Sequence, residues 1–465
     1  MIHMSSVSRL LYERVVKAGL CTGCGACAGI DPTGSVKMRS SLYDTVPDFG
    51  LRDERVLPEL AWTACPGKGI DYPALYRRHY GRLPENWLLG HFRKIRTGFA
   101  TDPVVRRKGA SGGVVTQVLL YLLRTRRIDA AIIVRQGLPT PREASVVIAE
   151  NPENIQAAAQ SVYIPVPVLD VLTRLDPTKR YAVTCLPDQA AALRQMQVDG
   201  FEPARRIKYI IGLYAGTALY PAAIECLLRS HGVGPSDPVT RLEWRAGEWP
   251  GHLEIHTSGG KVIRSRKAYY NYLIPFFVTR ASLQGMDFTN EFSDLSVGDA
   301  WSPRFERRGG GYSVVITRSA ELEDIVGEAI RERVLSLEII DPLKACDMHG
   351  HMLDFKKRGS YLRNRLKALT GGKVPDYGLR PKGIKGSRIG AEICISALFL
   401  LAGTTVARGC IRKIPESVIG PVFNTLRLTW KALSRPTKRK GLRTLKMECY
   451  EPSWLGTLKS NVEKA

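Results

Sequence analysis

The chain has 465 residues, 44% of them hydrophobic and 24% charged, so it can bury a sizeable core in two or three units. This composition excludes a wholly disordered chain, a collagen-like chain and a polytopic membrane protein. Lys and Arg number 68 against 44 Asp and Glu, a formal net charge of +24, which favours an anionic partner.

The positive charge is concentrated near the C-terminus. Residues 351–465 hold 24 Lys and Arg against seven Asp and Glu, whereas residues 1–350 hold 44 against 37. Ten cysteines are too few for a disulfide-stapled secreted protein. The start of the chain lacks the uninterrupted apolar stretch and the cleavage site of a signal peptide. We therefore expect a cytoplasmic protein with reduced thiols.

The first expected unit, residues 1–95, opens with a helical apolar pattern and continues into irregular sequence rich in Gly, Pro and Asp. Its run CTGCGACAG places Cys21, Cys24 and Cys27 at a C-x2-C-x2-C spacing, which suits three corners of an iron–sulfur cube. Cys65, which precedes a proline, supplies a fourth ligand. A zinc site of four cysteines is the alternative, but the overlapping triple spacing favours one [4Fe-4S] cluster.

The second expected unit, residues 96–335, alternates helical and strand patterns and predicts an α/β fold. We expect helices at 112–123 and 188–196, and strands at 129–135, 181–185, 209–214 and 312–318. Cys185 ends one of these strands just before a proline and a helix, at the edge where a parallel sheet binds ligands. The remaining five cysteines, which are neither Cys185 nor one of the four candidate ligands, are interpreted as core or incidental thiols.

Two loops of this unit carry candidate binding residues. Ser111, Gly112 and Gly113 open a helix after a basic stretch, so that free amides and the helix dipole can face a phosphate. A plain helix cap is the alternative. Gly298 and Asp299, followed by Trp301, place an acid and an aromatic plane before a strand, where a flavin or substrate can pack; the alternative is a surface turn with a packed tryptophan.

The third expected unit, residues 336–465, is a basic and mainly helical extension. Residues 389–407 contain a single charge, Glu392, and approach the ~20 residues that cross a bilayer. A buried helix, an interfacial or re-entrant membrane helix and a true span all stay open. Together with the basic excess, this segment suggests that residues 381–465 meet an anionic membrane surface. Nucleic acid is not expected, because the basic residues show no regular pairing with aromatic residues.

Several motifs in order resemble the family of coenzyme F420 hydrogenase/dehydrogenase beta subunits over about residues 15–330. They are CTGCGACAG, KGASGGVVTQVLLYLL, QSVYIPV, TCLPDQAAALR, DFTNEFSDLSVGDAW and GYSVVITR. The resemblance implies an N-terminal iron–sulfur loop domain and an α/β flavin-binding core, in which FAD exchanges a hydride with a substrate or with the deazaflavin coenzyme F420. The flavin pocket is expected among Ser111, Gly112, Gly113, Ser161, Tyr163, Cys185, Gly298, Asp299 and Trp301.

The chain departs from the family pattern at positions where many members carry further cysteines. It has Ala215, Ser282 and Gly285 there, so a second cluster cannot form around Cys185 alone. We therefore expect an iron–sulfur flavoprotein oxidoreductase with one cluster and one FAD, peripheral to the inner face of the membrane. Its electron donor would be a ferredoxin, another redox protein or reduced F420. The alternative is a non-catalytic accessory protein of surface-polysaccharide synthesis that keeps the fold and the cluster. No catalytic residue is assigned from the sequence.

Overall fold

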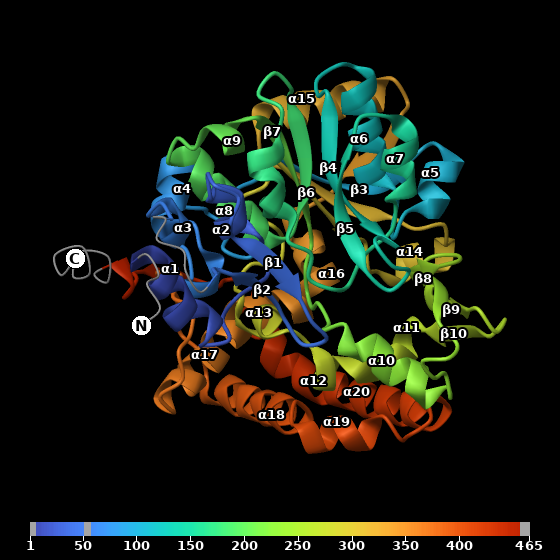
Figure 1. The fold of residues 1–465 in the computed structure, drawn as a ribbon. Coiled ribbons are helices and arrows are strands. Elements are labelled where there is room, and N and C mark those ends of the chain that lie inside the picture. The colour runs from blue at the N-terminus through green and yellow to red at the C-terminus, as the bar shows by residue number, and fades with distance from the viewer. Residues whose placement is uncertain (1–5, 51–56, 456–465) are drawn as a thin grey trace.

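A computed structural model describes residues 6–50 and 57–455. The main element is a mixed sheet with eight strands (Figure 1). In sheet order, these are β13 (Leu335–Ile339), β3 (Lys94–Ala100), β12 (Ser313–Thr317), β11 (Leu295–Asp299), β7 (Ile207–Leu213), β6 (Tyr181–Cys185), β4 (Ala130–Gln136) and β5 (Ala144–Ala149).

Four adjacent strands of this sheet, β11, β7, β6 and β4, run parallel to one another. Their carboxyl ends therefore meet at one edge, where Gln136, Cys185, Leu213 and Asp299 are the last strand residues. The other four strands pair antiparallel with their neighbours. The edge formed by the parallel strands is the place where α/β proteins gather ligand groups.

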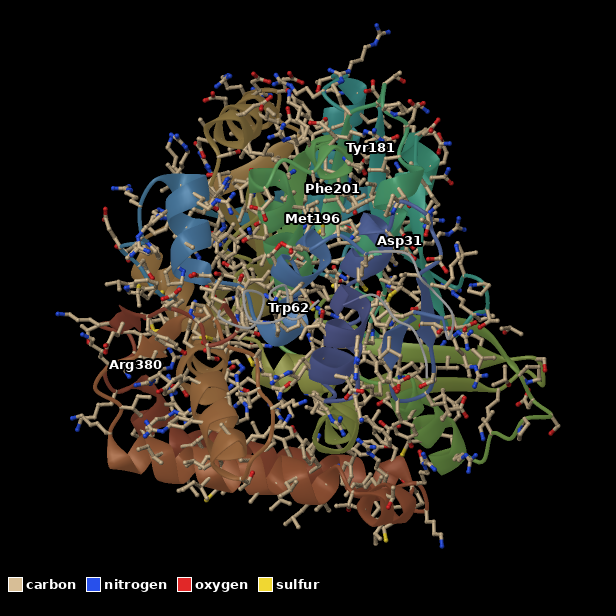
Figure 2. The ribbon with its side chains drawn as sticks, turned by 60° about the vertical axis from the view of Figure 1, so that its left-hand side comes forward. Asp31, Trp62, Tyr181, Met196, Phe201 and Arg380 are labelled. Atoms are coloured by element: carbon tan, nitrogen blue, oxygen red, sulfur yellow. The ribbon has the colours of Figure 1, made fainter. Side chains whose placement is uncertain are left out.

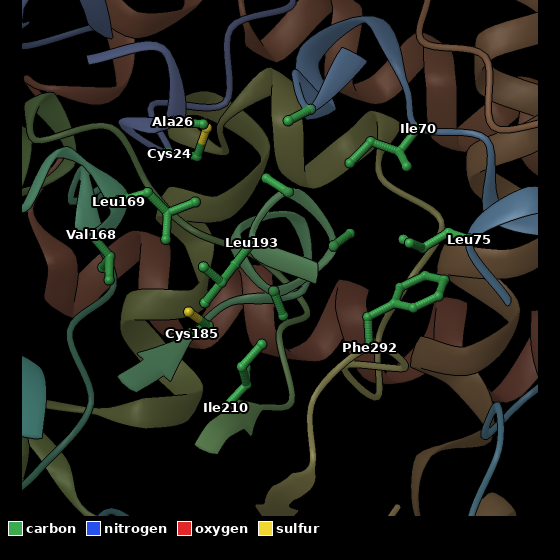
Figure 3. Packing of buried hydrophobic residues seen from close by; sticks show 14 of the residues in the cluster. Cys24, Ala26, Ile70, Leu75, Val168, Leu169, Cys185, Leu193, Ile210 and Phe292 are labelled. Atoms are coloured by element: carbon green, nitrogen blue, oxygen red, sulfur yellow. The ribbon is translucent and has the colours of Figure 1, made fainter. Parts of the chain in front are cut away.

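Both faces of the sheet are covered, which explains why its central strands are almost continuously apolar. Successive side chains of a strand point to opposite faces. Ile132 accordingly belongs to one buried cluster, which also contains Cys24 and Cys185. These two cysteines are labelled in Figure 3. Ile133 belongs to another cluster on the opposite side. The second cluster includes α6 (Val114–Arg124), α7 (Pro152–Ala157) and α15 (Ala320–Arg331), while the first includes α8 (Pro187–Val198).

The N-terminal part of the chain packs against the α8 side of the sheet. It consists of α1 (Ser6–Leu11), a π-helical turn (Tyr12–Val16), α2 (Ala26–Ile30), the hairpin β1 (Lys37–Ser40) and β2 (Thr45–Asp48), α3 (Leu60–Thr63), a 3-10 turn (Pro66–Lys68) and α4 (Tyr72–Tyr80). Trp62 and Met196 lie in the interior that these elements share, whereas Arg380 lies at the outer surface (Figure 2).

Shorter elements fill the connections between the strands. A separate three-stranded sheet contains β8 (Val239–Ala246), β9 (His252–Thr257) and β10 (Val262–Arg266). The remaining helices of this part are α5 (Pro103–Lys108), a 3-10 helix (Val168–Arg174), α9 (Glu202–Arg205), α10 (Ala222–Ser230), α11 (Lys267–Tyr270), a 3-10 turn (Asn271–Leu273), α12 (Ile274–Phe277), α13 (Arg280–Gln284) and α14 (Pro303–Arg308).

The C-terminal extension is mainly helical, and its helices α18, α19 and α20 form a layer at the bottom of Figure 1. It contains α16 (Pro342–Asp354), a π-helical turn (Phe355–Gly359), α17 (Ser360–Leu369), α18 (Gly386–Ala402), α19 (Thr405–Ile411), α20 (Glu416–Arg439) and the small pair β14 (Leu379–Pro381) and β15 (Met447–Cys449). Among the described residues, no single helix is long and apolar enough to cross a membrane; only α18 and α19 together, bent by 75°, have the length and composition to do so.

The α/β prediction is confirmed, and each helix and strand expected from the sequence of the second unit is present within a few residues of its expected range. The antiparallel half of the sheet was not expected from the sequence. The division of the chain at residues 95 and 335 stays a prediction, and side chains from all three stretches contribute to one buried cluster.

Candidate functional site

Four cysteines line one small cavity of about 20 Å³ between the N-terminal elements. These are the four cysteines singled out in the sequence, Cys21, Cys24, Cys27 and Cys65. The first two lie in the loop before α2, the third lies on α2, and Cys65 precedes the 3-10 turn after α3. Two segments that are 38 residues apart in sequence thus place their thiols around the same space.

Glycines allow this loop to turn tightly. Gly23 and Gly25 have φ angles of +71° and +85°, in the left-handed region that other residues avoid. A Cβ atom on Gly25 would also lie 2.7 Å from the amide nitrogen of Asp170. The loop therefore packs directly against the 3-10 helix at 168–174, which fixes the position of the cysteines relative to the sheet.

The four thiols are a chemically coherent donor set. Burial raises the pKa of each thiol, to about 12 for Cys21, and the neighbouring Cys65 raises the pKa of Cys21, Cys24 and Cys27 further. The free thiols are therefore protonated, and a metal bound here would have to displace their protons. Within residues 6–50 and 57–455, however, no three His, Cys, Asp or Glu side chains are grouped around the position of a single metal ion.

A second and much larger cavity, of about 1190 Å³, lies at the carboxyl edge of the parallel strands. Eight of the nine residues predicted for the flavin pocket line this cavity: Ser111, Gly113, Ser161, Tyr163, Cys185, Gly298, Asp299 and Trp301. Gly112 is the exception. Its amide donates to Ser313 Oγ at 3.0 Å, and a Cβ atom there would lie 2.6 Å from the carbonyl oxygen of Gly98, so it packs on β3 and does not face the cavity.

One wall of the large cavity is an ion-pair network around Asp299, at the end of β11. The Arg245 guanidinium donates to an Asp299 carboxylate oxygen at 3.3 Å and to the Tyr163 hydroxyl at 3.2 Å. Lys267 Nζ lies 3.8 Å from the same carboxylate. Burial would raise the pKa of Asp299, but Arg245 and Lys267 outweigh it and hold that pKa below its usual value. The same two cations lower the pKa of the buried Tyr163 hydroxyl.

Several buried polar atoms at this cavity have no hydrogen-bond partner among the described residues, and three of them lie on tyrosine or histidine side chains. These three are the hydroxyls of Tyr214 and Tyr270 and the Nε2 atom of His349. Burial lowers the pKa of His349 to about 4, so its imidazole is neutral at physiological pH. Buried polar groups without a partner are rare in native proteins. Their presence here, in a cavity large enough for a cofactor and a substrate, fits a site that receives a polar ligand.

The two cavities share part of their walls. Thr22, Pro66 and Gly67 line both the small cavity of the cysteines and the large cavity. Thr22 lies between two candidate ligands in the sequence, and Pro66 and Gly67 directly follow the fourth. A group held by the thiols would therefore be separated from a ligand of the large cavity by a single layer of residues.

The positions at which the resemblance led us to expect further cysteines in relatives also face the large cavity. Cys185, Ala215, Ser282 and Gly285 all line it. Cys185 is buried with a free thiol, and the other three positions offer no sulfur. Lys356 occupies this region as well, with Nζ donating to the carbonyl oxygen of Ser282 at 2.6 Å. The described part of the chain thus places no second set of thiolates beside Cys185.

Part of the large cavity was not predicted from the sequence. Side chains of α18 and α20 close its lower side, among them Phe399, Phe423, Arg427 and Lys438. The basic residues of α20 recur every three or four positions, a helical spacing that could have indicated one shared face. Which side of that helix meets the body of the protein could not be inferred from the spacing alone.

Two family models match consecutive parts of this chain. Residues 95–173 match the family model for the N-terminal part of coenzyme F420 hydrogenase/dehydrogenase beta subunits, and residues 178–342 match the model for the C-terminal part of the same subunits. The two matches together span more than half of the chain and contain nearly the whole eight-stranded sheet.

Individual relatives are distant in sequence. The chain is 25% identical to the coenzyme F420-dependent sulfite reductase of Methanocaldococcus jannaschii, over 79% of this chain and 55% of that protein, so it spans about half of the reductase. It is 22% identical to the beta subunit of the coenzyme F420 hydrogenase of Methanothermobacter thermautotrophicus, over 55% of this chain and 88% of that subunit.

A solved structure is also similar to part of the chain. It is the F420-reducing [NiFe] hydrogenase complex from Methanosarcina barkeri, with a TM-score of 0.47 and 19% identity, covering 61% of this chain and 96% of the matched chain. The names of the sequence relatives support a redox role. On the two family matches, this chain belongs to the family of coenzyme F420 hydrogenase/dehydrogenase beta subunits.

Proposed function

We propose that this chain is an iron–sulfur flavoprotein oxidoreductase, with one [4Fe-4S] cluster on Cys21, Cys24, Cys27 and Cys65 and one FAD in the large cavity. The observation that carries the proposal is the shared wall of the two cavities, formed by Thr22, Pro66 and Gly67. Electrons pass efficiently between redox groups only when these lie close together, and this arrangement brings the two candidate sites into contact. Reduced F420 or a ferredoxin would supply the electrons.

The donor set supports a cluster in preference to a single zinc ion. Zinc draws four sulfurs to about 2.3 Å from one point. The overlapping C-x2-C-x2-C spacing of Cys21, Cys24 and Cys27 suits three corners of a cube, and this spacing is the reason for preferring a cluster. A cube takes one thiolate at each of four irons and so holds its ligands farther apart.

The residues of the large cavity have defined parts in this proposal. A bound flavin would supply hydride exchange with the substrate and single-electron exchange with the cluster. Arg245 and Lys267 keep Asp299 ionised at the end of β11, and this network presents both charges to the cavity. His349 is neutral and offers an unpartnered ring nitrogen, which can hydrogen-bond to a bound ligand.

We expect about four irons and one FAD per chain after anaerobic purification, not eight irons, because the cavity offers only Cys185 where a second cluster would need four thiolates. Iron analysis, acid-labile sulfide analysis and flavin extraction measure these ratios. A colourless protein containing one zinc and no flavin would instead support the alternative function, an accessory protein of surface-polysaccharide synthesis without turnover. Eight irons would show that other cysteines had been recruited.

The FAD phosphates are proposed to bind at the N-terminus of α6, where Ser111, Gly113 and Val115 line the cavity. A Val115→Glu variant should lose most of its flavin, because the new carboxylate repels a phosphate at close range, and should keep its iron. An acidic residue in the first helical turn does not destabilise the helix. The matched control is Val115→Gln, which has nearly the same shape without the charge and should keep FAD. Equal flavin content in both variants would mean that the phosphates bind elsewhere.

A further inference from the structure

The long helix α20 is oriented in the opposite way to an ordinary surface helix. Surface helices normally turn their apolar side to the protein and their charged side to water. In α20, Val418, Val422, Leu426 and Leu433 recur at helical spacing and are 51–73% exposed. The opposite side of the helix, which borders the large cavity, is basic, with Arg427 and Lys438 partly buried and Lys431 and Arg435 exposed.

The basic side of α20 lines the large cavity. Arg427, Lys431, Arg435 and Lys438 follow one another at intervals of four, four and three residues, and all four line the cavity. The Nε atom of Arg427 is buried without a hydrogen-bond partner, and neither Lys431 nor Arg435 forms an ion pair with any residue that the structure describes. Several cations that face one cavity without carboxylate partners form a site for an anionic group.

The apolar outer side of α20 continues onto α18 and α19. Ile389, Ile393, Leu400 and Leu401 on α18 and Val406 on α19 are 37–75% exposed. The three helices lie side by side along one edge of the molecule (Figure 1). An exposed apolar surface of this extent marks an interaction site. We refer to the outer sides of α18, α19 and α20 as the apolar face.

Charge identifies the partner of the apolar face. Residues 386–440 hold ten Lys and Arg against two Glu, and both glutamates are buried and paired, Glu392 with arginines and Glu416 with His231 and Ser265. Arg388 and Arg439 are also paired, with Asp354 and Glu392 and with Asp347, whereas the other eight cations form no ion pair among the described residues. Apolar helices with such cations around them are complementary to a bilayer with anionic headgroups.

The apolar face and the large cavity are continuous. Leu398 on α18 and Trp430 on α20 are 52% and 37% exposed, and both also line the cavity. A molecule whose chain lies in the bilayer can therefore reach the cavity between these helices with its head against the basic row. The apolar chain of such a molecule would lie on the outer side of α20, and its anionic head would lie on the opposite, basic side of the same helix.

We propose that the apolar face docks on an anionic lipid bilayer and that the cavity takes up an anionic amphiphile from that bilayer, its head bound by Arg427, Lys431, Arg435 and Lys438. The proposal assigns the chain to a membrane surface and gives the chemical class of a ligand. It rests on the geometry of α18–α20 and is independent of the redox cofactors, because both of its tests measure binding.

Docking is tested by sedimentation of the full-length protein with vesicles of phosphatidylcholine, with and without 30% phosphatidylglycerol. The Leu426→Asp/Leu433→Asp variant should lose at least about tenfold in vesicle affinity, since it places two charges in the apolar face. The matched control, Val104→Asp/Ile339→Asp, changes residues of similar exposure away from the face and should bind as the unchanged protein does. Equal binding by both variants, or a stable dimer in solution that does not bind vesicles, would overturn the docking.

The ligand class is tested with dihexanoyl phosphatidic acid below its micelle concentration, with tryptophan fluorescence as the readout because Trp430 lies at the cavity. Lys431→Gln/Arg435→Gln should weaken this binding by at least about tenfold, at ~1 kcal/mol per basic residue. The control Arg264→Gln/Lys382→Gln removes two exposed cations elsewhere and should have no effect. Equal affinity for inorganic phosphate, or unchanged binding by the first variant, would overturn the assignment of an amphiphile to this row.

Discussion

A Cys65→Ala variant should contain less than about 0.5 iron atoms per chain, against about four in the unchanged protein. The reason is that a cube needs a thiolate at each corner, and Cys65 is the candidate ligand farthest in sequence from the other three. Its removal leaves only three thiol ligands, too few to hold the cube, so the whole cluster is expected to be lost during purification. Iron and acid-labile sulfide analysis of the anaerobically purified variant measures the effect.

Cys226→Ala is the matched control for this experiment. Cys226 is also buried and free, but it lies on α10 and lines neither of the two cavities. The control should keep its full iron content. Full iron in Cys65→Ala would show that the fourth ligand is another group, and equal loss in both variants would show that the effect comes from general destabilisation.

A Glu392→Gln variant should lose about 3–5 kcal/mol of its free energy of unfolding. Glu392 on α18 is completely buried and pairs with Arg363 at 2.6 Å and with Arg388 at 2.7 Å. Arg388 also pairs with the buried Asp354 at 2.9 Å. Neutralising Glu392 leaves two buried guanidinium groups with less negative charge around them, and this network attaches α18 to the α16–α17 segment. Denaturant unfolding followed by circular dichroism measures the loss.

The control for this variant is the same substitution at Glu448, which pairs with Arg380 at the surface of the same extension. Exposed ion pairs contribute about 0–1 kcal/mol, so Glu448→Gln should change stability by less than about 1 kcal/mol. Comparable effects at both positions would mean that the buried network does not anchor α18.

The sequence was most informative where local pattern and burial agree. The strand at 181–185 was predicted with its observed bounds, because its apolar run ends at Cys185 and is followed by a proline that begins α8. The sequence did not reveal that β12, β3 and β13 join the same sheet antiparallel. Strand order depends on long-range pairing, and an apolar run is compatible with either direction.

The candidate site, like the fold, was only partly predictable from the sequence. Spacing identified the cysteines that line the small cavity and most of the loop residues that line the large one. It misplaced Gly112, since a glycine that packs on a neighbouring strand has the same sequence pattern as one that approaches a ligand. Glu392 stood out as the single charge in an apolar segment, but its arginine partners Arg363 and Arg388 are set by tertiary packing. The sequence likewise could not show that the basic side of α20 borders the large cavity.

The central claim, that one cluster and one FAD exchange electrons within this chain, is tested most directly by an anaerobic reductive titration monitored by visible absorption and electron paramagnetic resonance. The account predicts an uptake of about three electrons per chain, two by the flavin and one by the cluster. Electrons should redistribute between the two groups without a slow phase after each addition of reductant, since Thr22, Pro66 and Gly67 line both cavities. An uptake of two electrons by flavin with no paramagnetic cluster signal, or no uptake by a protein that contains zinc, would contradict it.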